Sequence, residues 1–208
     1  MIRNIIFDLG GVLINLDAGA TSKAFRELGM ADFDQQFSFA KQSGLFDDFD
    51  RGKISPEEFR NSLRKFLPPG TTDNAIDDAW NAMLLDVPPR RLHLLESLGK
   101  NYRLFLLSNT NEIHVAAFSR ALEKTFGFRD FSGYFEKWYY SCRIGMRKPD
   151  REIFDFVLQE NNLDPQQTLF IDDSKQHVEG ARKSGIDATL LPPGEDILAF
   201  IKKVLPDH

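Results

Sequence analysis

The sequence alternates between short apolar runs and segments of helical spacing, and this alternation constrains the fold more than any other feature. The apolar runs stop at polar residues or glycine, as strands do, and helical segments separate them from residue 90 onward. Strands that alternate with helices form βαβ units. We therefore expect an α/β fold, with a mostly parallel sheet and helices on both of its faces.

The individual elements are predicted from apolar spacing and from helix start and stop signals. The expected strands cover residues 5–7, 102–107, 138–141, 168–171 and 188–191. The expected helices cover residues 21–28, 55–67, 73–85, 90–98, 112–125, 150–161, 174–184 and 195–204. Residues 143–150 are expected to form a loop.

The first apolar run ends at a single carboxylate, Asp8, which is soon followed by Gly10 and Gly11. This pattern is typical of a buried parallel strand that carries a side chain to its carboxyl end, where ligands bind in open parallel sheets. Backbone N–H groups beside residues without a Cβ can close around a phosphate. Taken alone, the same residues are also consistent with a core strand that ends in a turn.

Two regions of different character follow from the order of these patterns. Residues 16–87 contain helical signals and no convincing strand, so they are expected to form a helical domain inserted into a core of residues 1–15 and 88–208. The insert has one clear helix start, in which Ser55 is the N-cap and Glu58 closes a capping box.

The composition limits the class of function. The chain has 208 residues, 42% hydrophobic and 27% charged, which is typical of a globular protein. Its net charge of -5 and the lack of a basic stripe argue against a nucleic-acid partner. We expect no membrane span and no signal peptide. The single cysteine, Cys142, cannot form an internal disulfide, so a cytoplasmic location is expected.

Polar residues follow four of the expected strands, at positions that a parallel sheet would bring to one edge. They are Asp8, the pair Ser108 and Asn109, Lys148, and the pair Asp172 and Asp173. The carboxylates offer the oxygen ligands that Mg²⁺ prefers, and the hydroxyl, amides and ammonium could hold an anion beside it. This set fits phosphoryl transfer in which Asp8 attacks phosphorus and carries a phosphoaspartate. Each group alone could equally be a turn, a surface lysine or a helix cap.

The order of these motifs resembles the haloacid dehalogenase superfamily over essentially the whole chain. The segments that carry the resemblance are FDLGGVL at 7–13, LLSNT at 106–110, GMRKP at 145–149 and FIDDS at 170–174. The helical insert is similar to the C1 cap of that family. Within it the motifs look most like the bacterial α-glucose-1-phosphatase branch, and soluble epoxide hydrolase phosphatase domains are more distant.

The resemblance implies a Rossmann-like core, Mg²⁺ dependence and hydrolysis of a small phosphomonoester, for which a sugar phosphate such as a hexose 1-phosphate is a candidate. It also implies a role for each motif residue. The expected catalytic residues are Asp8, as nucleophile, and Lys148. The expected metal ligands are Asp8, the Gly10 carbonyl, Asp173, and Asp172 directly or through water. The expected phosphate-binding residues are Gly10, Gly11, Ser108, Asn109 and Lys148.

One position departs from the family pattern. Family phosphatases usually carry a second Asp two residues after the nucleophile, as general acid and base, and this chain has Gly10 there. Such help is worth about 10²–10⁴-fold. The chain could use leaving groups that need little protonation, take an acid from the cap or from water, or be a weak or inactive relative that only binds or regulates. We favour activity, because the glucose-1-phosphatase branch also resembles this chain in having Gly there.

Two other classes use similar residues. Receiver domains carry their acidic pair on the first strand, whereas Asp172 and Asp173 come last here. Haloacid dehalogenases that act on carbon use the same nucleophile without Mg²⁺. The acidic pair argues against that chemistry, because these carboxylates would repel Asp8 without a cation. The substrate, the cap residues that line its pocket and the oligomeric state are left open.

Overall fold

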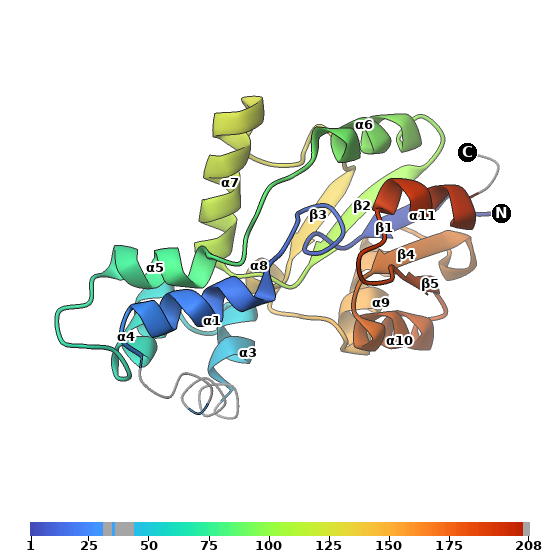
Figure 1. The fold of residues 1–208 in the computed structure, drawn as a ribbon. Helices are drawn as coiled ribbons and strands as arrows, with labels where there is room; N and C mark the ends of the chain where they lie inside the picture. Colours follow the sequence, from blue (N-terminus) through green and yellow to red (C-terminus); the bar gives the residue numbers. More distant parts are fainter. Residues whose placement is uncertain (31–34, 36–43, 206–208) are drawn as a thin grey trace.

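The computed structural model describes residues 1–30, 35 and 44–205. A five-stranded sheet in the order β3-β2-β1-β4-β5 forms its centre (Figure 1). The strands are β1 (Asn4–Phe7), β2 (Arg103–Ser108), β3 (Lys137–Tyr140), β4 (Thr168–Asp172) and β5 (Asp187–Leu190). Each neighbouring pair is parallel, so the carboxyl ends of all five strands face the same edge. The predicted α/β fold with a parallel sheet is confirmed.

The strand register brings distant parts of the chain to the same level of this edge. Phe7 of β1 lies beside Leu106 of β2 and Ile171 of β4. The next residues along β1 and β4 are Asp8 and Asp172, which therefore emerge side by side. Successive side chains of a strand point to opposite faces, so this pairing also places both carboxylates on the same face.

Helices cover both faces of the sheet (Figure 1). One face packs against α6 (Pro89–Leu98), α7 (Glu112–Phe126) and α11 (Ile197–Val204). The other face packs against α9 (Arg151–Glu160) and α10 (Lys175–Lys183). The alternation along β1 follows from this arrangement, because Ile5 and Phe7 belong to the first core and Ile6 to the second. In the described ranges 1–30, 35 and 44–205, no helix is both long enough and apolar enough to cross a bilayer.

Two short helices connect the strands of the core. The helix α8 (Ser141–Ile144) follows β3, and the 3₁₀ helix η1 (Pro165–Gln167) precedes β4. The prediction of a loop over residues 143–150 is therefore wrong at its first two positions. The turn of α8 ends at Gly145, which adopts the left-handed conformation that favours glycine.

Four further helices lie beyond the carboxyl ends of the strands (Figure 1). They are α1 (Ala18–Glu27), α3 (Leu45–Asp50), α4 (Pro56–Arg64) and α5 (Asp73–Asn81). They bury a core of their own that includes Phe25, Phe49, Phe59 and Trp80. The predicted capping box is confirmed, since Ser55 Oγ accepts from the Glu58 N–H and the Glu58 carboxylate accepts from the Ser55 N–H. We call these four helices the helical segment.

The two connections between the helical segment and the sheet run side by side. The Asn15 N–H donates to the Asp86 carbonyl, the Leu85 N–H donates to the Asn15 carbonyl, and Leu16 forms an antiparallel bridge with Leu84. The chain thus enters and leaves the helical segment at one place. Its assignment to a separate domain of residues 16–87 stays a prediction.

Candidate active site

Three carboxylates meet at the carboxyl edge of the sheet. Asp8 follows β1, Asp172 ends β4 and Asp173 comes next, and one oxygen of each lies within 4.8 Å of the others. Opposite ligands of a Mg²⁺ ion are about 4 Å apart, given Mg–O distances of about 2.1 Å. A small movement of these side chains would therefore let all three share one divalent cation.

Lys148 lies between two of these carboxylates and is fully buried, with 0% of its surface exposed. Its Nζ donates to Asp8 Oδ1 at 2.7 Å and to Asp172 Oδ2 at 2.6 Å. Burial lowers the pKa of Lys148, but the two carboxylates outweigh burial and raise it above its usual value. When all three carboxylates are ionised, they and the ammonium together carry two negative charges, which is the charge that a divalent cation neutralises.

The pKa values of the two buried carboxylates, Asp8 and Asp172, shift in opposite directions. Burial raises the pKa of Asp8 to about 7, although Lys148 opposes the shift. Burial also acts to raise the pKa of Asp172, but Lys148 and then His177 outweigh it and hold this pKa at about 2. Asp172 is thus a fixed negative charge, while the charged form of Asp8 gains from a nearby cation.

The loop after β2 fixes the position of Lys148. Asn109 Nδ2 donates to the Lys148 carbonyl at 2.8 Å, and the Lys148 N–H donates to Asn109 Oδ1 at 2.9 Å. A second reciprocal pair joins Thr110 to Ser141, whose Oγ accepts from the Thr110 N–H and donates to its carbonyl. The buried Ser108 lines a cavity of about 80 Å³ together with Gly10 and Asn109.

Gly10 and Gly11 differ in how strictly the structure requires a glycine. Gly11 has a φ of +72°, and a Cβ there would lie 2.0 Å from Asp173 Oδ2. A side chain at Gly11 is therefore excluded by both the backbone and the neighbouring carboxylate. At Gly10 a Cβ would lie 2.8 Å from the Cδ1 of Leu16, which is the end of a flexible side chain. Gly10 is thus not required by the backbone.

The structure brings every predicted site residue to one edge of the sheet, and their chemical roles stay predictions at this point. The sequence reasoning missed His177, whose Nδ1 lies 3.0 Å from Asp172 Oδ1. The signal was available, because a histidine five residues after Asp172 lies in the first turn of the helix that follows β4. The Ser174 N–H also donates to Asp172 Oδ1, at 2.8 Å.

The reasoning also missed a cavity of about 460 Å³ between the loop after β2 and the helical segment. Asn109 and Asn111 line it from the loop after β2, and α1 and α3 contribute most of the lining residues from the helical segment. Its remaining lining residues include Phe46, Asp47, Asp50, Trp80, His114 and Arg147. Because Asn109 lines this cavity and also contacts Lys148, the cavity adjoins the carboxylate cluster.

Asp50 is the most perturbed acid of this cavity. Burial raises its pKa to about 6, and a hydrogen bond from Asn111 Nδ2 at 3.3 Å opposes the shift. Arg147 lies 3.8 Å from Asp50 and also forms an ion pair with Asp47. Burial lowers the pKa of His114 to about 4, so its ring is neutral near pH 7.

Comparison with known proteins points to one family. A family model described as haloacid dehalogenase-like hydrolase matches residues 2–185. The D-ribitol-5-phosphate phosphatase of Bacteroides thetaiotaomicron is 33% identical over 196 residues, which cover 94% of this chain and 95% of that protein. A sesquiterpene phosphatase of Aspergillus oryzae is 27% identical over 183 residues, which cover 87% and 85%.

Solved structures give the same result. A haloacid dehalogenase family enzyme of Bacteroides thetaiotaomicron, in complex with magnesium and inorganic phosphate, matches with a TM-score of 0.88 and 37% identity over 96% of this chain and 99% of that chain. A hydrolase of the same kind from Porphyromonas gingivalis has a TM-score of 0.87 and 34% identity over the whole of both chains. A dehalogenase with a TM-score of 0.63 and 20% identity, over 98% of this chain and 97% of that chain, shares the fold.

Proposed function

Because the chain belongs to the haloacid dehalogenase-like hydrolase family, we propose that it is a Mg²⁺-dependent phosphatase that hydrolyses a small phosphomonoester. One observation carries the proposal: Lys148 bridges Asp8 and Asp172 inside a carboxylate cluster that also includes Asp173. The similar phosphatase of ribitol 5-phosphate, and the similar structure that holds magnesium and phosphate, support it.

Asp8 is the nucleophile in this mechanism. Lys148 holds Oδ1, so we assign the attack to Oδ2. A bond from Oδ2 to phosphorus forms while the bond from phosphorus to the ester oxygen breaks, and water then releases phosphate and restores the carboxylate. Ser108, Asn109 and Lys148 hold the phosphate oxygens, with Gly10 and Gly11 providing a close approach of the backbone.

The metal-binding residues of the proposal are Asp8, the Gly10 carbonyl and Asp173, with Asp172 acting directly or through water. Asp172 already accepts from Lys148 and Ser174, which favours the contact through water. A bound Mg²⁺ supplies neutralisation of the charge on the phosphate and the carboxylates. The position of each ligand follows from the strand ends that carry it.

The proton for the leaving group is assigned to Asp50, because Gly10 cannot supply it. Asp50 lines the cavity of about 460 Å³ that adjoins Asn109, where a leaving group would extend from the phosphate. Its raised pKa of about 6 keeps a share of the carboxyl protonated near neutral pH. His114 faces the same cavity, but its pKa of about 4 makes it an acceptor there.

The cavity favours a hydroxylated leaving group. Asp50, Asn111 and Arg147 offer hydrogen bonds to hydroxyl groups, whereas an apolar chain would bury these groups without partners. A sugar or polyol phosphate is therefore the expected substrate class, and a hexose 1-phosphate or a pentitol 5-phosphate are the first candidates. The closeness to the α-glucose-1-phosphatase branch and a cytoplasmic location remain part of the proposal.

Release of phosphate from a panel of esters tests the proposal. The panel contains p-nitrophenyl phosphate, ribitol 5-phosphate, glucose 1-phosphate and glycerol 3-phosphate, each measured with Mg²⁺ and with EDTA. We expect Mg²⁺-dependent hydrolysis of at least one ester, and loss of at least 10³-fold in kcat for Asp8→Asn, since the attacking oxygen is replaced. Absence of metal-dependent release from all four would contradict it.

The second candidate function is a binding or regulatory protein that holds a ligand at this site without hydrolysing it. The observation that favours it is Gly10, which cannot act as a general acid. In that case ribitol 5-phosphate binds with Mg²⁺ but is not hydrolysed. Gly10→Asp would then create activity, because only the tip of Leu16 must move to admit the side chain. A dehalogenase would instead release halide from 2-haloacids without metal.

A further inference from the structure

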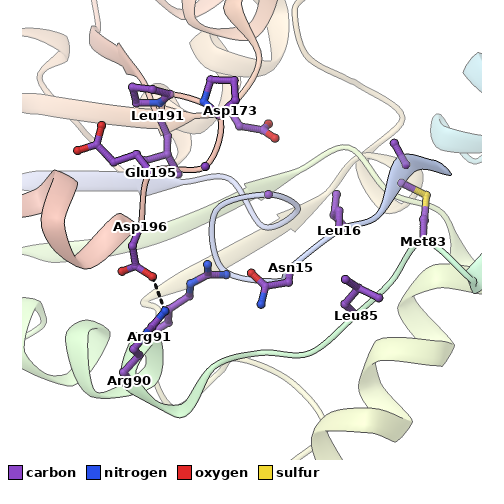
Figure 2. A pocket seen from close by; sticks show the side chains of 15 residues that line it. Asn15, Leu16, Met83, Leu85, Arg90, Arg91, Asp173, Leu191, Glu195 and Asp196 are labelled. Atoms are coloured by element: carbon purple, nitrogen blue, oxygen red, sulfur yellow. Dashed lines mark hydrogen bonds and ion pairs between the residues drawn. The ribbon is translucent and has the colours of Figure 1, made fainter. Parts of the chain in front are cut away.

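A larger cavity, of about 700 Å³, lies on the sheet side of the connections to the helical segment (Figure 2). Its walls come from the loop after β1, the start of α6 and the loop between β5 and α11. Gly11 and Asp173 also line it, so it opens beside the carboxylate cluster. The mechanism above makes no use of this space.

Arg91 lines this cavity, and the fold alone does not explain why its charged side chain is buried. Only 7% of its surface is exposed. Its Nε and Nη1 are buried and have no hydrogen-bond partner among the residues that the structure describes. A buried charge without a partner is strongly destabilising, and a perturbed ionisable group in a cleft is a candidate for a functional site.

The two carboxylates that attract Arg91, Asp196 and Asp86, already accept other hydrogen bonds. Asp196 attracts Arg91, but its Oδ2 accepts from Arg90 Nη2 at 2.7 Å and its Oδ1 accepts from the Leu198 N–H at 2.9 Å. The Oδ1 of Asp86 accepts from Asn15 Nδ2 at 2.9 Å. In Figure 2 a dashed line marks the hydrogen bond between Arg90 and Asp196, whereas the Arg91 guanidinium points toward Asn15.

The surroundings keep Arg91 charged and add to its positive potential. Burial lowers the pKa of Arg91 and Asp196 raises it, but a guanidinium stays protonated at neutral pH. Arg91 lies in the first turn of α6, where the helix dipole is positive. Pro88, at the N-cap, has no side-chain acceptor to neutralise that end of the helix.

We infer that Arg91 forms an oxyanion-binding subsite in this cavity, which takes a phosphate or carboxylate group beside the carboxylate cluster. A guanidinium offers several donors in one plane, which suits an oxyanion. The anion comes either from a second charged group of the substrate or from a free anion in solution. The subsite itself does not depend on turnover, so its test is separate from that of the proposed phosphatase activity.

Equilibrium dialysis with labelled inorganic phosphate and Mg²⁺ counts the phosphates that bind per chain. We expect two for the wild type, one at the carboxylate cluster and one at Arg91, and one for Arg91→Met. The matched control is Arg129→Met, an arginine exposed on the surface and paired with Glu123, which should still bind two. Equal numbers of phosphates bound by the wild type and by Arg91→Met would overturn the inference. Absence of the cluster phosphate from both proteins would count against the proposed function alone.

Thermal unfolding supplies the second readout. In phosphate-free buffer, Arg91→Met should melt at the same temperature as the wild type or higher, because an unpaired buried charge is removed. Phosphate should then raise the Tm of the wild type more than that of the variant. Equal increases in both would count against the subsite. If the Met variant does not fold, Arg91→Lys should weaken the second phosphate about tenfold, and unchanged affinity would overturn the inference.

Kinetics separate the two sources of the anion. If it is a second charge of the substrate, Arg91→Met raises KM for 3-phosphoglycerate and leaves KM for glycerol 3-phosphate unchanged. If it is a free anion, sulfate changes the rate on glycerol 3-phosphate in the wild type but not in the variant. Hydrolysis of p-nitrophenyl phosphate by Arg91→Met verifies that the carboxylate cluster is intact.

Discussion

Lys148 is buried between two carboxylates, and its removal would leave both without their cation. Loss of one partner of a buried ion pair costs about 3–5 kcal/mol, so Lys148→Met should lower the free energy of unfolding by that amount without metal. Mg²⁺ should restore part of the loss, because the ion neutralises the same carboxylates. Chemical unfolding with and without Mg²⁺ measures both effects.

The control for this variant is Lys175→Met, which removes an exposed lysine that forms a surface pair with Glu179. Its effect should stay within about 0.5 kcal/mol and be independent of Mg²⁺. An equal loss for the two variants would show that Lys148 acts as an ordinary surface lysine. The buried position at 0% exposure argues against that outcome.

The raised pKa of Asp50 predicts that the pH dependence of hydrolysis varies with the leaving group. The pKa of its carboxyl is raised to about 6 by burial, so the acid form that donates the proton is lost as the pH rises through 6. At saturating Mg²⁺, which favours the charged form of Asp8, the value of kcat/KM for glycerol 3-phosphate should fall over that range. Asp50→Asn should lower kcat/KM by about 10²–10⁴-fold at low pH and abolish this pH dependence. p-Nitrophenyl phosphate, whose leaving group needs no proton, should show neither effect.

Other charged or titratable side chains lie near Asp50, namely Arg147 at 3.8 Å, Asp47, His114 and Cys142. Asp47→Asn is therefore the matched control, because it removes a neighbouring acid of α3 and leaves Asp50. If kcat/KM falls through pH 6 in Asp47→Asn as in the wild type, and does not fall in Asp50→Asn, the fall is assigned to Asp50. The reverse result would contradict the role of Asp50.

The residues of the carboxylate cluster could be predicted because each directly follows an apolar run, and parallel strands deliver their ends to one edge. Asp50 and Arg91 could not be predicted in this way. Their roles depend on burial and on residues far away in the sequence, such as Asn111 for Asp50. No local pattern separates these two from exposed charged residues of a helix, whereas His177 lies only five residues after its partner Asp172.

At the scale of elements, the boundaries that differ from prediction have tertiary causes. The helix expected over residues 73–85 ends at Asn81 because residues 83–86 pair with the connection at residues 15–17. The helix expected from residue 21 begins at Ala18, since Asp17 accepts from the Gly19 N–H as its N-cap. The observed strand boundaries differ less from the predicted ones, because each strand is an apolar run that ends where the buried core ends.

The turn after β1 carries a prediction at the same scale. Gly11→Ala should lower the free energy of unfolding by about 1 kcal/mol and weaken Mg²⁺ binding at least tenfold, because the new Cβ would displace Asp173. Gly70→Ala is the matched control, since Gly70 also has a positive φ of +87° but has open space around it. Calorimetric titration with Mg²⁺ decides, and equal affinity in both variants would remove Asp173 from the ligand set.

At the scale of the molecule, the sheet carries the proposed reacting groups at its carboxyl edge, and the helical segment lines a cavity beside them. This division explains how much the sequence could predict. The family motifs lie at strand ends, whereas the cavity walls combine α1, α3, α5 and α7 with the loop after β2. Contacts of that kind depend on how the helical segment sits on the sheet, and a linear pattern does not contain this information.

The balance of charge at the sheet edge couples the stability of the whole chain to metal. Three carboxylates against one ammonium disfavour the folded state without a cation, so Mg²⁺ should stabilise it by binding the folded chain alone. At a hundredfold excess over the dissociation constant the gain is about 2.7 kcal/mol, which for a chain of this size raises Tm by roughly 5–10 °C. Thermal unfolding with Mg²⁺ and with EDTA measures the shift. Asp173→Asn should lose most of it, whereas Asp187→Asn, at the exposed start of β5, should keep it. If Asp173→Asn kept the full shift, the ion would bind elsewhere, and the carboxylate cluster would lose the charge argument that makes it a metal site.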